Sequence, residues 1–173
     1  EQLVDIDDIT FRDKSMFNTL KMILKISKMD TSVLLTGETG TGKTHIAKLI
    51  HKYSNRNEKT FIEINCGAIP ESLIESEFFG YEAGAFTGAS KKGKMGVFEL
   101  ANNSTLFLDE ISELNIDLQV KLLKVLESLE VRRIGGEKII QTNARIIAAT
   151  NRNLRELIKE GKFREDLYYR LNV

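Results

Sequence analysis

The fold is decided by the stretch Gly37-Glu38-Thr39-Gly40-Thr41-Gly42-Lys43-Thr44, which has the GxxxxGK[ST] spacing of a phosphate-binding loop. An aliphatic run precedes it and a helical pattern follows from near Thr44, the context that this motif requires. Glycines let backbone N–H groups converge on phosphate oxygens, and the start of a helix adds partial positive charge. An ordinary glycine turn would explain neither the lysine nor the hydroxyl. We predict that these eight residues bind ATP, with Lys43 on the β- and γ-phosphates and Thr44 ligating Mg²⁺.

The rest of the chain alternates between short apolar runs and longer amphipathic patterns. Four runs predict strands buried on both faces: Ser32 to Thr36, Phe61 to Asn65, Thr105 to Asp109 and Arg145 to Thr150. Three patterns with apolar residues three to four apart predict helices over 16–27, 46–53 and 118–129. The alternation favours one α/β domain with a parallel sheet. It is interrupted by Gly80 to Gly96 and by Val131 to Thr142, where the Gly135-Gly136 pair suits a tight hairpin turn.

Composition bounds the environment of the chain. Its 173 residues, 42% of them hydrophobic, are enough to bury a core. Cys66 is the single cysteine, so no internal disulfide can form, and we expect a reducing, cytoplasmic compartment. The apolar runs are about five residues long against the roughly 20 that span a bilayer, so we expect no membrane partner. The 25 basic and 25 acidic residues cancel, which argues against a broad basic surface for nucleic acid.

Two acidic residues end the third predicted strand. Asp109 and Glu110 would lie at the carboxyl edge of a parallel sheet, where ligands bind in open α/β folds. We predict that Asp109 holds Mg²⁺ and that Glu110 activates the attacking water as general base. Without the upstream loop, a solvated strand end would explain the pair equally well.

Amides and arginines supply the remaining candidates. Asn151 follows the fourth strand and Asn65 ends the second, so Asn151 could orient the γ-phosphate and Asn65 could hydrogen-bond Glu110, although either could simply cap a loop. Arg164 and Arg170 lie too far along the chain to be presumed partners of the same loop. Arginines supplied from a neighbouring subunit stabilise phosphoryl transfer, but a surface helix with internal ion pairs is the alternative.

A glycine-flanked hexapeptide lies in the first interruption. Gly84-Ala85-Phe86-Thr87-Gly88-Ala89 permits a sharp, mobile loop with an exposed Phe-Thr tip, and gives little reason for core packing. The bland alternative is a glycine-rich hairpin tip. The pattern favours a contact surface.

These motifs together resemble the central AAA+ ATPase domain of bacterial enhancer-binding proteins, the activators of sigma-54 RNA polymerase typified by the nitrogen regulator family. The resemblance rests on the GAFTGA string and its preceding segment, 75–83, and it runs essentially from Ser32 to Val173. It implies a three-layer α/β/α sandwich with a mainly parallel five-stranded sheet. It also implies a hexameric ring, with a dimer or heptamer as alternatives.

The resemblance assigns roles residue by residue. Asn65 resembles the switch residue of the catalytic glutamate, Asp109-Glu110 the Walker B pair and Thr150-Asn151 sensor I. Arg164 and Arg170 resemble arginine fingers, and Val131 to Thr142 resembles a second pore-facing loop. All six residues of GAFTGA would contact sigma-54, Phe86 and Thr87 most directly, so that hydrolysis drives open-complex formation.

The sequence departs from the family at two positions. Thr44 stands where many members carry Glu, and Ser104 replaces a common glycine. We expect residues 1–173 to be the ATPase core, ending before the helical lid, with the regulatory domain and the helix-turn-helix that binds enhancer DNA outside this chain. Two rival hypotheses remain: a general AAA+ machine such as an unfoldase, which has no reason to carry GAFTGA, and an ATP-gated interaction module without turnover.

Overall fold

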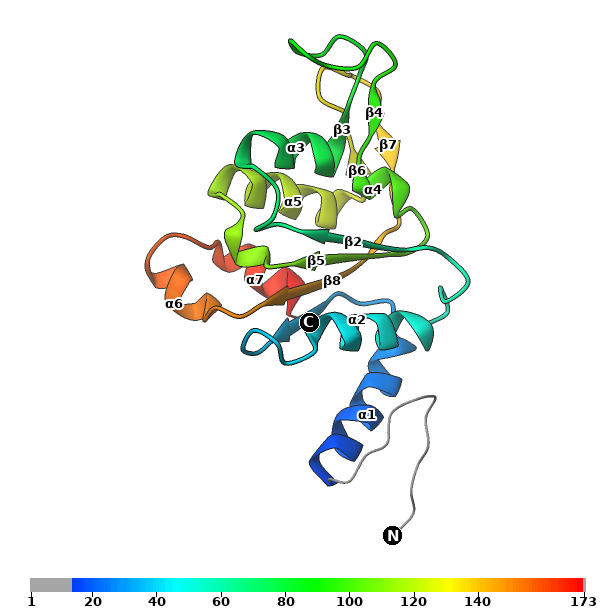
Figure 1. Cartoon of the computed structure of the whole chain (residues 1–173), viewed down its shortest axis with the longest axis vertical. Helices are drawn as coiled ribbons and strands as arrows, with labels where there is room; N and C mark the ends of the chain where they lie inside the picture. Colours follow the sequence, from blue (N-terminus) through cyan, green and yellow to red (C-terminus); the bar gives the residue numbers. More distant parts are fainter. Residues whose placement is uncertain (1–13, 173) are drawn as a thin grey trace.

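A parallel sheet lies at the centre of the molecule, between layers of helices (Figure 1). The computed structural model describes residues 14–172. Four strands pair in the order β1-β8-β5-β2, all of them parallel: β1 (Val33–Thr36), β2 (Phe61–Asn65), β5 (Thr105–Asp109) and β8 (Arg145–Thr150). They match the four predicted runs, so the parallel α/β fold is confirmed. The described residues form four strands in this sheet and not the expected five. The fifth strand was implied by the family resemblance alone, and no further apolar run of this chain predicts it.

Helices cover both faces of the sheet. On one face lie α1 (Lys14–Ser27) and α2 (Lys43–Lys52). On the other lie α3 (Glu71–Phe79), α4 (Val97–Leu100) and α5 (Ile116–Ser128). The short 3₁₀ turn η1 (Ile111–Glu113) follows β5, and α6 (Leu154–Lys159) and α7 (Glu165–Leu171) follow β8. Among the described residues, no helix has the length and apolarity needed to cross a bilayer.

The central strands are apolar throughout because each of their faces packs on a separate core. In β5, Leu106 and Leu108 join the cluster beneath α3 and α5, whereas Phe107 joins the cluster beneath α1 and α2. In β8, Ile146 and Ile147 divide in the same way. The period-two alternation of a strand therefore serves two cores at once.

Two small hairpins project from one end of the molecule (Figure 1). The first pairs β3 (Gly80–Tyr81) with β4 (Lys94–Met95), and the second pairs β6 (Glu130–Val131) with β7 (Ile140–Gln141). A tight turn does form at Gly135-Gly136, where Gly135 has φ of +74° and the Gly136 N–H donates to the Arg133 carbonyl at 2.9 Å. It is not by itself the connection of the hairpin, which spans 132–139. The physical reason is that Ile134 pairs with Tyr81 of the first hairpin instead of with β7.

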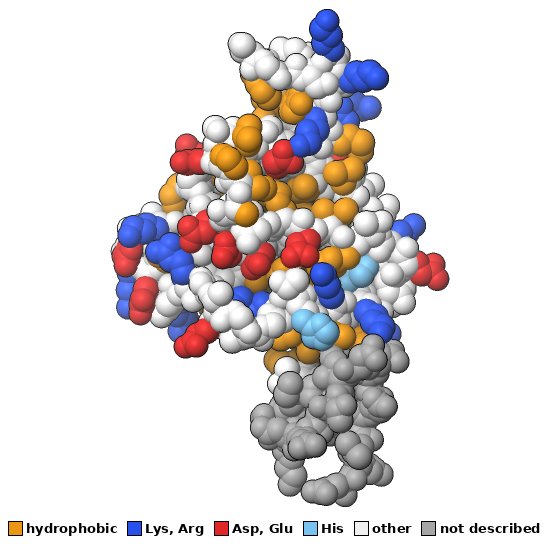
Figure 2. Space-filling view, viewed as in Figure 1, with side chains coloured by type: hydrophobic (Ala, Val, Ile, Leu, Met, Phe, Trp, Pro, Cys, Tyr) orange, Lys and Arg blue, Asp and Glu red, His pale blue; other side chains and the backbone are white. Residues whose placement is uncertain are grey.

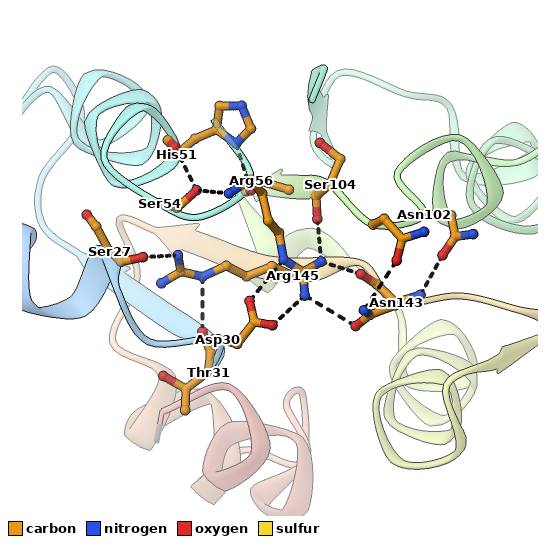
Figure 3. Close-up of polar contacts among 12 residues, drawn as sticks. Ser27, Asp30, Thr31, His51, Ser54, Arg56, Asn102, Ser104, Asn143 and Arg145 are labelled. Atoms are coloured by element: carbon orange, nitrogen blue, oxygen red, sulfur yellow. Dashed lines mark hydrogen bonds and ion pairs between the residues drawn. The ribbon is translucent and has the colours of Figure 1, made fainter. Parts of the chain in front are cut away.

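A polar network holds the amino ends of the strands (Figure 3). The buried Arg145 donates to the carbonyl oxygens of Ser27, at 3.0 Å, and Ile26, at 2.8 Å. Arg56 donates to Asp30 through two hydrogen bonds of 2.9 and 2.7 Å and thereby lowers the pKa of that carboxyl. These contacts fasten the turn between α1 and β1 to the start of β8, opposite the carboxyl ends of the strands.

His51 in α2 is 7% exposed, and both of its ring nitrogens have partners. Nε2 lies 2.9 Å from the carbonyl oxygen of Lys59, and Nδ1 lies 2.8 Å from the hydroxyl of Thr105. Because a carbonyl only accepts, Nε2 carries the proton and Nδ1 accepts from Thr105. Burial lowers the pKa of His51 below its ordinary value of 6.5.

We predict that acid destabilises the fold through His51. Below pH 6.5 the imidazole is protonated in the unfolded chain but stays neutral in the folded one. The contribution of His51 to the free energy of unfolding is therefore complete above pH 6.5 and decreases as the pH falls toward the lowered pKa. One such proton corresponds to a slope of at most about 1.4 kcal/mol per pH unit. Urea unfolding between pH 5 and 8 measures it. His51→Gln should remove this slope and His45→Gln, at an exposed position, should keep it; equal slopes in both variants would contradict the assignment.

Candidate nucleotide site

The glycine-rich loop has the backbone that its sequence predicts. Gly40 and Gly42 have φ of +81° and +82°, a left-handed region that favours glycine. α2 starts directly after Gly42, so its first N–H groups point toward the loop. The Gly37 N–H donates to the carbonyl of Thr150, at 3.3 Å, which fixes the start of the loop on the neighbouring strand.

The charged end of Lys43 lies across this loop. Its Nζ donates to the carbonyl oxygens of Gly37 and Glu38, both at 2.7 Å. Thr41 Oγ1 also donates to the Glu38 carbonyl, at 2.7 Å. Two carbonyl oxygens therefore hold the ammonium group where phosphate oxygens could replace them, since an anionic oxygen is the stronger acceptor.

The parallel register brings the other candidates to the same edge. Asn65 pairs with Asp109 across β2 and β5, and Thr36 pairs with Thr150 across β1 and β8. A cavity of about 270 Å³ opens there, lined by Thr39, Gly40, Gly42, Lys43, Thr44, Asp109, Glu110 and Asn151. The structure thus gathers the loop, both acids and one amide around one hollow.

Glu110 has a strained backbone and a close neighbour. Its φ is +52°, which is uncommon for a residue with a Cβ and is often found where function requires it. A Cβ added to Gly67 would lie 2.2 Å from Glu110 Oε2, so the glycine leaves room for the carboxylate. Gly67 could not be predicted from sequence, because no motif marks a single glycine whose neighbour, Glu110, follows a different strand.

The two amides behave differently. Asn151 Nδ2 donates to Thr39 Oγ1, at 2.8 Å, which ties the end of β8 to the glycine-rich loop. Asn65 Oδ1 accepts from the N–H groups of Gly67 and Ala68, at 2.8 and 3.2 Å. Among the described residues its hydrogen bonds do not include Glu110. In this state Asn65 therefore has a loop-capping geometry, which is the alternative to a hydrogen bond with Glu110.

Oxygen ligands for a divalent cation meet in the same cavity. Thr44 and Asp109 both line it, one with a hydroxyl and one with a carboxylate. Mg²⁺ is held by few protein oxygens, together with phosphate oxygens and water, so this pair fits the ion. The described residues contain no group of three or more His, Cys, Asp or Glu side chains suited to an all-protein metal site.

Cys66 lies beside Asp109 but has an unreactive thiol. It is 3% exposed, and burial, followed by the charge of Asp109, raises its pKa to about 12. A thiol with this pKa is protonated at neutral pH and is a poor nucleophile. The chemistry of the cavity therefore belongs to the carboxylates and the loop.

Neither predicted arginine finger lines the cavity. Arg164 donates to Asp166 through two hydrogen bonds of 3.0 and 2.7 Å, which raise the pKa of the guanidinium and lower that of the carboxyl. Arg170 donates to the carbonyl of Leu126 in α5, at 2.6 Å. Within this chain neither arginine reaches the cavity.

The GAFTGA hexapeptide forms the tip of the first hairpin. Phe86 is 43% exposed and packs edge-on against Tyr81, with ring centroids 5.1 Å apart. Gly84 and Gly88 have φ of +72° and +93°, as expected for glycines at both shoulders. Figure 2 shows Lys and Arg side chains near this projecting end.

The second hairpin braces the first. Ile134 exchanges backbone hydrogen bonds of 3.0 and 2.9 Å with Glu82 and Gly80. Arg133 pairs bidentately with Glu99 of α4, at 2.9 and 2.6 Å, and lies 3.6 Å from Glu82. The two hairpins therefore share one set of contacts.

A glycine-rich loop between β1 and α2, acids at the end of a neighbouring strand and a parallel sheet between helices define a P-loop NTPase of the AAA+ class. The model of one family, the sigma-54 interaction domain, matches residues 9–173. The chain belongs to this family.

Similar proteins carry names that agree with the family. A signal-transduction and transcriptional-control protein of Clostridium beijerinckii is 57% identical over 96% of this chain. The formate hydrogenlyase transcriptional activator FhlA of Escherichia coli is 49% identical over the whole chain, and the Nif-specific regulatory protein of Azospirillum lipoferum is 50% identical over 97%. The chain spans 26%, 25% and 27% of the length of these three relatives.

Solved structures agree in fold. NtrX of Brucella abortus in complex with ATP has a TM-score of 0.86 and 32% identity, covering 97% of this chain and 37% of NtrX. Hsp104 has a TM-score of 0.62 with 19% identity, covering 90% of this chain and 31% of its own, and so shows the fold alone.

Proposed function

We propose that this chain is the ATP-hydrolysing core of a sigma-54-dependent transcriptional activator. The observation that carries the proposal is the single cavity that joins Lys43 and Thr44 of the loop to Asp109 and Glu110 of β5. ATP binds with its phosphates on the loop, and Glu110 accepts a proton from the attacking water. Thr44 and Asp109 would hold Mg²⁺, which neutralises charge on the phosphate oxygens. Asn151, which lines the same cavity at the end of β8, orients the terminal phosphate.

The active site is completed between subunits. In its own subunit Arg164 is 38% exposed and lies away from the cavity, which supports a target on a neighbour. To reach that target, its guanidinium would have to leave Asp166, with which it pairs in one subunit. An arginine from outside stabilises the charge that develops during phosphoryl transfer. A ring, most simply a hexamer, with a dimer or heptamer as alternatives, would place Arg164 and Arg170 in this position.

Phosphate release is coupled to the hairpin tip through α3. This helix begins at Glu71, a few residues after Asn65 at the catalytic edge, and ends where β3 begins at Gly80. Lys94 of β4 pairs with Glu77 of α3, which fastens the hairpin to the helix. A shift of Asn65 toward Glu110 would therefore move the tip residues 84–89 against sigma-54 and drive open-complex formation.

The remaining parts of the proposal rest on the relatives. Their names as transcriptional activators support a cytoplasmic role in transcription, and the name of the signal-transduction protein of Clostridium beijerinckii supports a role in signalling, for which we propose a two-component system. Residues 1–173 constitute the ATPase core, of which 1–13 and 173 lie outside the described residues. Enhancer DNA is contacted by a further domain.

Two assays on the full chain test the proposal and its rivals. Phosphate release in Mg²⁺-ATP distinguishes an ATPase from an interaction module without turnover. Open-complex formation by sigma-54 RNA polymerase distinguishes an activator from a general AAA+ machine, to which the chain is similar only in fold. ATP turnover that leaves the closed complex unchanged would exclude the activator function and leave the ATPase standing.

A further inference from the structure

Gln119, in the first turn of α5, is a completely buried amide with no role in the proposed chemistry. Its exposed fraction is 0%. Nε2 donates to the carbonyl oxygens of Leu114, at 2.8 Å, and Lys162, at 3.0 Å. Oε1 accepts from the backbone N–H of Arg164, at 2.8 Å. Both amide hydrogens and the amide oxygen are therefore used by backbone groups of two segments, one that lies five residues earlier at Leu114 and one that lies 43 to 45 residues later.

One of these segments leaves the catalytic edge. Leu114 follows η1, which begins directly after Glu110, so little chain separates the carboxylate from the carbonyl that Gln119 holds. The same segment is tied to β8, because Thr150 Oγ1 donates to Ser112 Oγ at 3.0 Å in a buried contact. A change at Glu110 or at the end of β8 reaches Leu114 through short, packed backbone.

The other segment presents an arginine. Arg164 precedes the first residue of α7, and its backbone N–H is fixed by Gln119. Phe163, 2% exposed, anchors the preceding residue in the core. Asp166 then holds the guanidinium outward. Gln119 thus fixes the backbone from which the Arg164 side chain projects.

We infer that Gln119 is a positioning residue for hydrolysis in the neighbouring subunit: it links the segment behind Glu110 to the backbone of Arg164. This inference rests on the proposed function, because it needs Arg164 to act on a neighbour. Without the amide, Leu114 and Lys162 lose a shared donor and Arg164 loses its acceptor, so the guanidinium leaves its productive position. A misplacement of about 1 Å costs about 100-fold in rate when the reacting groups depend on geometry.

The test is Gln119→Met, which keeps the volume of the side chain and removes its three hydrogen bonds. In the full chain we expect kcat for phosphate release to fall about 100-fold. Affinity for a fluorescent ADP analogue should stay within about twofold, because the cavity itself is untouched. Glu127→Met, which puts the same side chain on the exposed face of α5, should change neither quantity. Should Gln119→Met not bind nucleotide, Gln119→Asn, polar but too short to reach, takes its place.

Mixed rings separate positioning from a merely structural role. Gln119→Met subunits keep their own loop and carboxylates, whereas Lys43→Ala subunits keep their arginines. We expect the mixture to hydrolyse ATP faster than either variant alone, and we expect the same of Arg164→Ala mixed with Lys43→Ala. Recovery with Arg164→Ala but none with Gln119→Met would overturn the inference and leave the intersubunit site intact. No recovery in either mixture would remove the intersubunit site and the inference together.

Discussion

Glu110→Gln will reduce phosphate release by about 10²- to 10⁴-fold, the usual contribution of a general base, while ATP still binds. The amide keeps the size of the side chain but has no lone pair basic enough to accept a proton from water. Nucleotide affinity depends on the loop, whose contacts do not involve Glu110. Single-turnover phosphate release and binding of a fluorescent ATP analogue measure the two effects separately.

Glu113→Gln is the matched control, because it makes the same change three residues further on, at an exposed carboxylate. It should release phosphate at the unaltered rate. Normal turnover in Glu110→Gln would assign the base to another group and strengthen the hypothesis of an interaction module. Loss of nucleotide binding instead would show that Glu110 shapes the cavity.

Truncation of the hairpin tip should separate ATP hydrolysis from its output. We expect Phe86→Ala and Thr87→Ala each to lower open-complex formation by at least about 10-fold, because removing an interface anchor costs about 2 kcal/mol or more. Phosphate release should remain within about twofold, since the tip lies outside the cavity. Promoter opening by sigma-54 RNA polymerase and phosphate release are measured on the same preparation.

Met95→Ala provides the control for this experiment. Met95 is 44% exposed in β4 of the same hairpin, so its truncation removes a similar amount of apolar surface below the tip. Open-complex formation should survive it. If Met95→Ala and Phe86→Ala lowered open-complex formation equally, the tip would not be a specific contact site for sigma-54.

The elements that were predictable from sequence are those whose signal is local. β5 and β8 are apolar without interruption because both faces are buried, and the glycine-rich loop has fixed spacing between Gly37 and Thr44. The parallel register then brings Asp109 to the loop without further information.

The features that escaped prediction depend on contacts between distant segments. The course of the connection at 132–139 depends on Ile134, which pairs with Tyr81 of the other hairpin. Gln119 was not predicted, because two of its three partners, Lys162 and Arg164, lie more than 40 residues further along the chain. Asn65 could be placed at the sheet edge, but its partner in this state depends on the turn at Gly67.

The bracing of the first hairpin by the second has a mechanical consequence. An isolated two-stranded hairpin is marginally stable in water. A flexible loop can transmit a pulling force but not a pushing force. The hydrogen bonds of Ile134 to the GAFTGA hairpin and the ion pair of Arg133 with Glu99 support this hairpin from the side. We therefore expect the hairpin to resist bending, like a strut. A strut bears compression as well as tension, so this chain can push on what it touches as well as pull it.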